Sequence, residues 1–169
     1  MPVSRTMILA TCAALALGGC KVSTSTTTDA VDTTKVAEGI KADVTKAVAG
    51  FNAKDVAAAT AIDAENYVSM FHGMPNAEGK AADVKITQEQ MAGSETKLEV
   101  SDPAVDVAAS GDLAVVRMTY SFTYLDPATK KPATEQGNWL LGFKKQKDGS
   151  MKAEWGVVSD TGKAAAPAT

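Results

Sequence analysis

His72, the only histidine in the chain, is the first candidate for a catalytic residue. An imidazole changes its charge near neutral pH, so it can serve as a general base. A base of this kind needs an orienting acid, and the closing strand-like segment offers Asp160 or Glu154. Glu65, at the start of the segment that contains His72, is the other candidate base. The alternative interpretation is a histidine at a loop edge, beside Gly73.

Two methionines flank this histidine at alternate positions, in the run Met70-Phe71-His72-Gly73-Met74. In an extended strand, Met70, His72 and Met74 would project from one face. Thioether and imidazole groups together suit Cu(I), so the run is a candidate copper site. Against this interpretation, methionine commonly fills pockets, and Gly73 can end the strand before Met74.

Larger side chains on the strand-like segments are candidates for the wall of a ligand pocket. Such a wall suits a small apolar molecule, although the same aromatic residues also build ordinary protein cores. The chain has neither the Gly-x-Ser-x-Gly motif of serine hydrolases nor a glycine-rich phosphate loop, and it implies no cofactor. The predicted ligand-binding residues are Tyr67, Met70, His72, Tyr120, Trp139 and Trp155.

The elements that must hold these residues follow from hydrophobic spacing. Apolar residues recur every three or four positions from Val36 to Phe51, which predicts a helix that begins at Thr34. Shorter helices are predicted at 55–62 and 82–91, on either side of an extended segment at 67–71. Alternation of apolar and polar residues then predicts strands at 96–109, 113–125, 134–145 and 151–159. Three helices followed by four long antiparallel strands indicate an α+β protein.

The first twenty residues resemble the signal peptide of a bacterial lipoprotein. One positive charge at Arg5 precedes a mainly apolar run, which is shorter than the ~20 residues of a membrane-spanning helix and typical of a secretory signal. The run 17–20 (LGGC) resembles a lipobox, which implies cleavage before Cys20 and lipidation of its thiol. Lys21, by analogy with Gram-negative sorting, favours the outer membrane. We therefore expect a periplasmic protein attached to the membrane through the lipid on Cys20.

The composition argues against a nucleic-acid partner and indicates which part of the chain folds. The 169 residues carry 17 Lys and Arg against 20 Asp and Glu, a formal net charge of −3. A chain of this charge has no excess of basic residues to bind phosphate groups, so we expect no nucleic-acid partner. Ser and Thr dominate after the lipobox, which is typical of a flexible tether. The predicted division is a signal peptide (1–19), a lipidated tether (20–34), a folded domain (35–160) and a loose tail (161–169).

The order of elements over 35–160 resembles the nuclear transport factor 2-like superfamily, which includes ketosteroid isomerase and the SnoaL-like polyketide cyclases. Beside the opening helix, the stretches that carry the resemblance are Asp63–Val68, Ser110–Arg117, Gly137–Lys145 and Asp148–Lys152. The resemblance implies a cone-shaped fold, in which a curved antiparallel sheet wraps around the N-terminal helices and leaves a pocket. Some relatives use this pocket for catalysis and others for binding. Dimers are common among them, so a homodimer is a further expectation.

The resemblance also places the proton-shuttling aspartate of ketosteroid isomerase at or near Met70, which cannot accept a proton. Isomerase chemistry of that kind is therefore disfavoured. The preferred function is non-catalytic binding of a small apolar ligand, or of a protein partner through the open sheet. Two alternatives stay open: an isomerase, cyclase or hydrolase that uses His72 in the pocket, and Cu(I) binding through Met70, His72 and Met74.

Overall fold

The computed structural model describes residues 30–126 and 128–162. The predicted signal peptide, Cys20 and the end of the predicted tail lie outside these residues. Within them, the helices are α1 (Thr33–Asn52), α2 (Val56–Ala59) and α3 (Lys80–Met91). The strands are β1 (Asp63–Phe71), β2 (Ala77–Glu78), β3 (Lys97–Val100), β4 (Ala104–Val107), β5 (Leu113–Leu125), β6 (Pro132–Lys145) and β7 (Met151–Asp160). No helix in this part of the chain is both long and apolar enough to cross a membrane.

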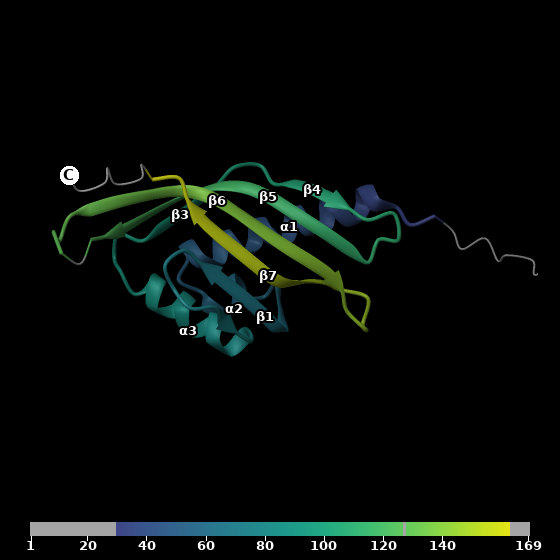
Figure 1. Cartoon of the computed structure of the whole chain (residues 1–169), viewed down its shortest axis with the longest axis horizontal. Coiled ribbons are helices and arrows are strands. Elements are labelled where there is room, and N and C mark those ends of the chain that lie inside the picture. The colour runs from purple at the N-terminus through teal and green to yellow at the C-terminus, as the bar shows by residue number, and fades with distance from the viewer. Residues whose placement is uncertain (1–29, 127, 163–169) are drawn as a thin grey trace, which may run out of the picture.

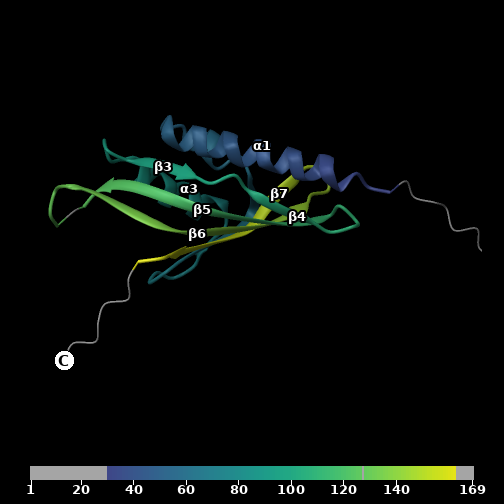
Figure 2. The same cartoon turned by 90° about the horizontal axis from the view of Figure 1, so that it is seen from above.

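The first helix confirms the predicted helical spacing. Its N-terminus is capped by Asp32, whose carboxylate accepts a hydrogen bond from the backbone N–H of Lys35 at 3.1 Å. Its apolar stripe packs against the inner face of the sheet, where most of the core lies. The buried apolar residues of this stripe are Ile40, Val44, Ala47 and Phe51. Figure 2 shows α1 lying along one face of the long strands.

The sheet has the order β2-β1-β7-β6-β5-β3, and β4 pairs with β5 beside β3. The longest pairing joins β5 and β6, from Leu113 opposite Lys144 to Leu125 opposite Pro132. On β5 the buried side chains alternate with exposed ones, because successive residues of a strand point to opposite faces. The long strands curve over β1, α2 and α3, which lie together on the inner side (Figure 1). The expected α+β cone-like fold is therefore confirmed.

Two predictions about the sheet are corrected. The sheet is mixed rather than antiparallel, because β1 runs parallel to β7, with Phe71 opposite Val158. These two strands are far apart in the sequence, so no hairpin fixes their relative direction. The predicted strand at 96–109 is divided into β3 and β4, since Pro103 between them has no backbone N–H to donate to a ladder.

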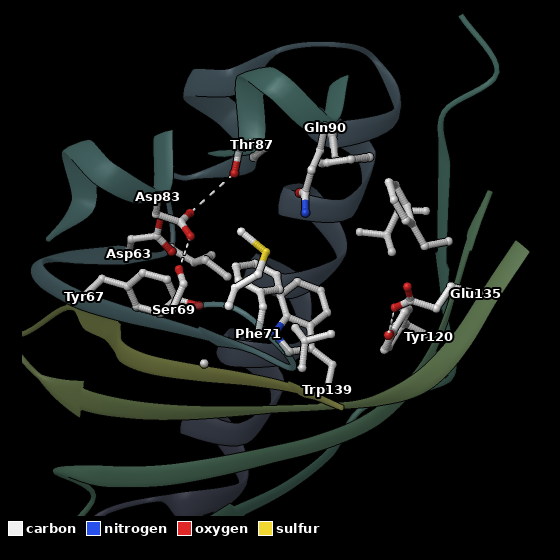
Figure 3. Close-up of a pocket in the computed structure, with 18 of the residues that line it drawn as sticks. Asp63, Tyr67, Ser69, Phe71, Asp83, Thr87, Gln90, Tyr120, Glu135 and Trp139 are labelled. Atoms are coloured by element: carbon white, nitrogen blue, oxygen red, sulfur yellow. Dashed lines mark hydrogen bonds between the residues drawn. The ribbon is translucent and has the colours of Figure 1, made fainter. Parts of the chain in front are cut away.

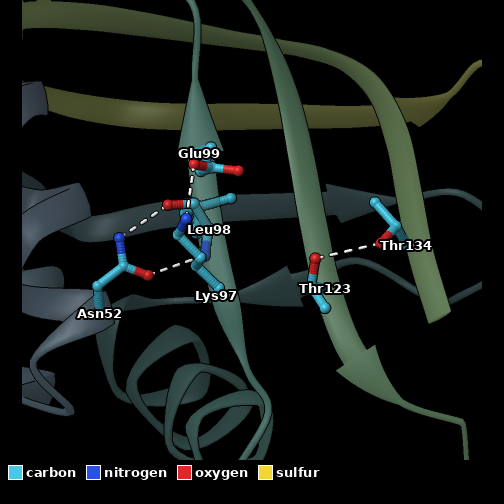
Figure 4. Close-up of polar contacts among 6 residues, drawn as sticks. All are labelled: Asn52, Lys97, Leu98, Glu99, Thr123 and Thr134. Carbon is cyan, nitrogen blue, oxygen red and sulfur yellow. Dashed lines mark hydrogen bonds and ion pairs between the residues drawn. The ribbon is translucent and has the colours of Figure 1, made fainter. Parts of the chain in front are cut away.

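The two ends of α1 lie at different ends of the molecule. Near its start, Val31 contacts Gly111 in the turn between β4 and β5 so closely that a Cβ there would overlap the valine. At its end, the Asn52 amide exchanges two hydrogen bonds of 2.8 Å with the backbone N–H and C=O of Leu98 (Figure 4). This contact fixes the edge strand β3 to the helix, beside Phe51.

Candidate functional site

A cavity of about 320 Å³ lies between the inner face of the sheet and the three helices. Its volume is in the range of pockets that hold small organic molecules. Apolar side chains from every layer of the fold make up most of its wall. They are Phe51, Ala59, Ile62, Phe71, Met74, Leu98, Phe122, Trp139 and Val158.

One side of the cavity holds two carboxyl groups, Asp63 and Asp83, which we call the acid pair (Figure 3). Both oxygens of Asp83 accept hydrogen bonds, one from the hydroxyl of Ser69 and one from the hydroxyl of Thr87 at 3.4 Å. Asp63 is only 6% exposed, and its Oδ2 has no hydrogen-bond partner among the described residues. This oxygen has almost no accessible surface, so it is closed off from the open part of the cavity.

Strand and helix periodicity bring this cluster together. Tyr67 and Ser69 are two residues apart on β1, so both point to the same side of the strand. Asp83 and Thr87 are one turn apart on α3, so they share a helix face. Asp63 begins β1 at its junction with α2, where the backbone N–H of Ala153 donates to the preceding Ile62 carbonyl at 2.8 Å.

Burial, together with the charge of the neighbouring Asp83, raises the pKa of Asp63 to about 8. Lys80 opposes this increase, a hydrogen bond between the two carboxyl groups adds to it, and Lys152 opposes it. The two ammonium groups do not cancel the effect of burial. At neutral pH the Asp63 carboxyl is therefore protonated, and its proton is shared with the carboxylate of Asp83.

Tyr67 places a hydroxyl beside the acid pair. Burial raises its pKa, and the charges of Asp83 and Asp63 add to the increase, so the phenol stays neutral. The hydroxyl lies against Gly156 of β7, where a Cβ would overlap it. A glycine is needed at this position because the aromatic side chain approaches the backbone so closely.

A second polar pair lies on the opposite side of the cavity (Figure 3). The hydroxyl of Tyr120 on β5 donates a hydrogen bond to the Glu135 carboxylate on β6. Burial raises the pKa of Tyr120, and the hydrogen bond to Glu135 contributes because it favours the neutral phenol. The Tyr120 ring covers Gly137, its cross-strand partner. The cavity thus has an apolar middle and a polar group on each of two sides.

The structure brings four of the six predicted ligand-binding residues into the wall. Tyr67, His72, Tyr120 and Trp139 line the cavity, whereas Met70 and Trp155 are absent from its lining. Tyr67, Ser69 and Phe71 occupy the pocket side of β1, so Met70 between them points the other way. Trp155 lies on the outer side of β7, against Gly142, and Gly156 faces the cavity.

The candidate base and the candidate copper ligands are only partly assembled. His72 lines the cavity with its Nε2 at 3.6 Å from Oδ2 of Asp160, and both side chains are about half exposed. Glu154, the other proposed orienting acid, lies 3.9 Å from Lys144 instead. Met74 lines the cavity, but Met70 does not. Since β1 ends at Phe71, the strand alternation that would place both methionines on one face does not continue to Met74.

The acid pair and its hydroxyl partners were not among the residues predicted from the sequence. The four-residue spacing of Asp83 and Thr87 was a usable signal, since it puts both side chains on one face of a predicted helix. The position of Ser69, two residues after Tyr67, was another. Nothing local indicated Asp63, because it lies before the extended segment that the sequence predicted.

Comparisons with known proteins agree with this architecture. The family model described as a SnoaL-like domain matches residues 44–151. Among solved structures, a ketosteroid isomerase-like protein from Erwinia carotovora atroseptica is 23% identical, with a TM-score of 0.61 over 75% of this chain and 96% of that chain. A nuclear transport factor 2-like superfamily protein from Salmonella enterica is 13% identical, with a TM-score of 0.67 over 80% and 97%.

A hexachlorocyclohexane dehydrochlorinase is 9% identical, with a TM-score of 0.64 over 76% of this chain and 89% of that chain. At these identities the likeness concerns the fold alone. No curated protein sequence matches the chain.

Proposed function

Because this chain belongs to the SnoaL-like domain family, we propose that it is a binding protein whose internal cavity holds a small, mainly apolar molecule. The observation that supports this proposal is the cavity of about 320 Å³ with its largely aromatic and aliphatic wall. Burial of such a molecule removes apolar surface from water on both partners, which favours association.

The position of the two tryptophans provides a direct test, because the chain contains only Trp139 and Trp155. Trp139 lines the cavity and Trp155 lies on the outer side of the sheet. Naphthalene is a suitable probe, since it is apolar and uncharged. In Trp155→Phe, which keeps Trp139, we expect naphthalene to change the tryptophan emission in a saturable way.

The matched control is Trp139→Phe, which keeps Trp155. We expect its emission to stay unchanged over the same naphthalene concentrations. Equal responses from the two variants would mean binding outside the cavity, and no response from either would also contradict the proposal.

Binding has stronger support than catalysis by His72. The distance of 3.6 Å between His72 and Asp160 exceeds a hydrogen bond, and both groups are well exposed to solvent, which weakens their interaction. A copper site at Met70, His72 and Met74 has less support still, since Met70 is not part of the cavity wall. The expected homodimer and a protein partner on the open sheet stay predictions.

We further propose that the protein is a lipoprotein of the cell envelope, attached through a lipid on Cys20 and located in the periplasm, on the outer membrane. The support comes from the sequence: a short apolar run, the lipobox-like residues 17–20 and the polar stretch that follows. The described structure begins at residue 30, so an attached domain starts within about ten residues of the proposed lipid.

A further inference from the structure

We propose that the ligand of the cavity is an apolar amine, whose ammonium group pairs with the carboxylate of Glu135 beside the rings of Tyr120 and Trp139. This inference rests on the proposed binding function and names the class of ligand for the same cavity. It depends on three features: the carboxylate of Glu135 has no cationic partner, aromatic rings lie next to it, and the acid pair on the other side already has partners of its own.

The first feature is the Glu135 side chain, which is half-buried and lines the cavity. Its carboxylate accepts a hydrogen bond from the hydroxyl of Tyr120. Within residues 30–126 and 128–162 it forms no ion pair, and no lysine or arginine lines the cavity. His72, which does line the cavity, lies beside Asp160 instead. The Glu135 carboxylate is therefore open to a cation that a ligand supplies, and their attraction is stronger here than in bulk water.

The second feature is the group of aromatic rings next to this carboxylate (Figure 3). Glu135, Gly137 and Trp139 are alternate residues of β6, so they share the pocket side of the strand. The Tyr120 ring covers Gly137 and so occupies the space between the other two side chains. Phe122 lies opposite Glu135 on β5 and also lines the cavity. Because the faces of aromatic rings attract cations, an ammonium group at Glu135 gains a second kind of contact.

The third feature distinguishes Glu135 from the acid pair. Both oxygens of Asp83 accept hydrogen bonds from hydroxyl groups, and Asp83 also shares the proton of Asp63. Two cations, Lys80 and Lys152, lie close enough to the acid pair to oppose the rise in the pKa of Asp63. An ammonium group from a ligand therefore gains more at Glu135, where charge-assisted hydrogen bonds are still to be made.

Two naphthalene derivatives test the inference, because they share a ring system with a one-carbon arm and differ in charge. 2-Naphthalenemethanol is neutral, whereas 2-(aminomethyl)naphthalene carries an ammonium group at neutral pH. Isothermal titration calorimetry at about pH 7 and about 0.02 M salt gives the affinity of each for the unmodified protein. We expect the amine to bind roughly tenfold more tightly than the alcohol, since only the amine gains the ion pair and the contacts with the ring faces.

Salt provides a second measurement on the unmodified protein. Ions screen the attraction between the ammonium group and a half-buried carboxylate, whereas they do not weaken the burial of the naphthalene ring. The advantage of the amine over the alcohol should therefore shrink when the salt concentration is raised to about 0.5 M.

Glu135→Gln should reduce the advantage of the amine to less than about twofold, because an amide carries no charge. Its carbonyl oxygen can still accept the hydrogen bond from Tyr120, and the affinity for the alcohol reports whether the cavity is intact. The matched control is Glu99→Gln, which removes an exposed carboxylate that pairs with Lys97 at 2.8 Å, outside the cavity lining (Figure 4). This control should keep the full advantage of the amine.

Three results would overturn the inference while leaving the proposed function intact. They are equal binding of the two probes by the unmodified protein, an advantage of the amine that salt does not reduce, and an advantage that Glu135→Gln retains. If neither probe binds to the unmodified protein, the proposed binding function fails, and the inference fails with it.

Discussion

Asp63 links the stability of the fold to pH. Its pKa is about 8 in the folded protein, against an ordinary value of 3.8 that applies to the unfolded chain. Between these values the folded state binds one proton more than the unfolded state. The free energy of unfolding must therefore fall as the pH rises through this window, by at most about 1.4 kcal/mol per pH unit, and this contribution becomes constant above about pH 8.

The substitution Asp63→Asn should remove this dependence, because an amide cannot titrate. We expect urea unfolding at a series of pH values from about 5 to about 9 to show a smaller loss of stability in the variant than in the unmodified protein. A matched control is Asp126→Asn. Backbone hydrogen bonds from Thr129 and Ala128 lower the pKa of Asp126, so its titration lies below this range.

The control should change the free energy of unfolding by the same amount at every pH in the series. If Asp63→Asn gave a curve parallel to that of the unmodified protein, Asp63 would not be the titrating group.

At the scale of elements, the contact between Asn52 and Leu98 holds an edge strand in the wall of the cavity. Its two hydrogen bonds of 2.8 Å join the end of α1 to β3, and Leu98 itself lines the cavity. We expect Asn52→Ala to lower the free energy of unfolding by about 1–2 kcal/mol, measured by urea denaturation, because two backbone groups lose their partner.

The comparison variant is Thr123→Val, which removes an exposed cross-strand contact between the hydroxyls of Thr123 and Thr134 at 3.2 Å (Figure 4). This variant should cost less than about 0.5 kcal/mol, since it removes a single hydrogen bond rather than two, and the remaining Thr134 hydroxyl can bond to water. A loss in Asn52→Ala no greater than that in Thr123→Val would show that β3 is held mainly by its pairing with β5.

Elements with a clear period were predictable from the sequence, and contacts between distant segments were not. The spacing of Ile40, Val44 and Phe51 predicted α1, and the alternation along 113–125 predicted β5. The parallel pairing of β1 with β7 depends on residues that are far apart in the chain, so no local pattern contains it. The acid pair was not predictable for the same reason, because Asp63 and Asp83 meet only when α3 packs on β1.

At the scale of the whole molecule, the proposed lipid anchor predicts where the protein is found in the cell. The chain contains two cysteines, Cys12 in the apolar run and Cys20 in the lipobox-like residues. We expect Cys20→Ala to move the full-length protein from the membrane fraction to the soluble or precursor fraction of a Gram-negative host, and to abolish its labelling by a radioactive fatty acid.

Cys12→Ala is the matched control, since it removes a thiol from the same segment without changing the lipobox. It should keep both the membrane location and the label. Membrane attachment and labelling that survive Cys20→Ala, or that are lost in Cys12→Ala, would contradict the anchor.

The length of α1 separates the two ends of the molecule. The helix has 20 residues, so it extends about 30 Å from the turn beside Val31 to Phe51 in the cavity wall. If the proposed lipid is attached at Cys20, the helix would act as a spacer between the bilayer and the proposed binding site. A ligand would then be exchanged with the surrounding water, or with a soluble carrier that meets the distal end, while the protein stays on the membrane.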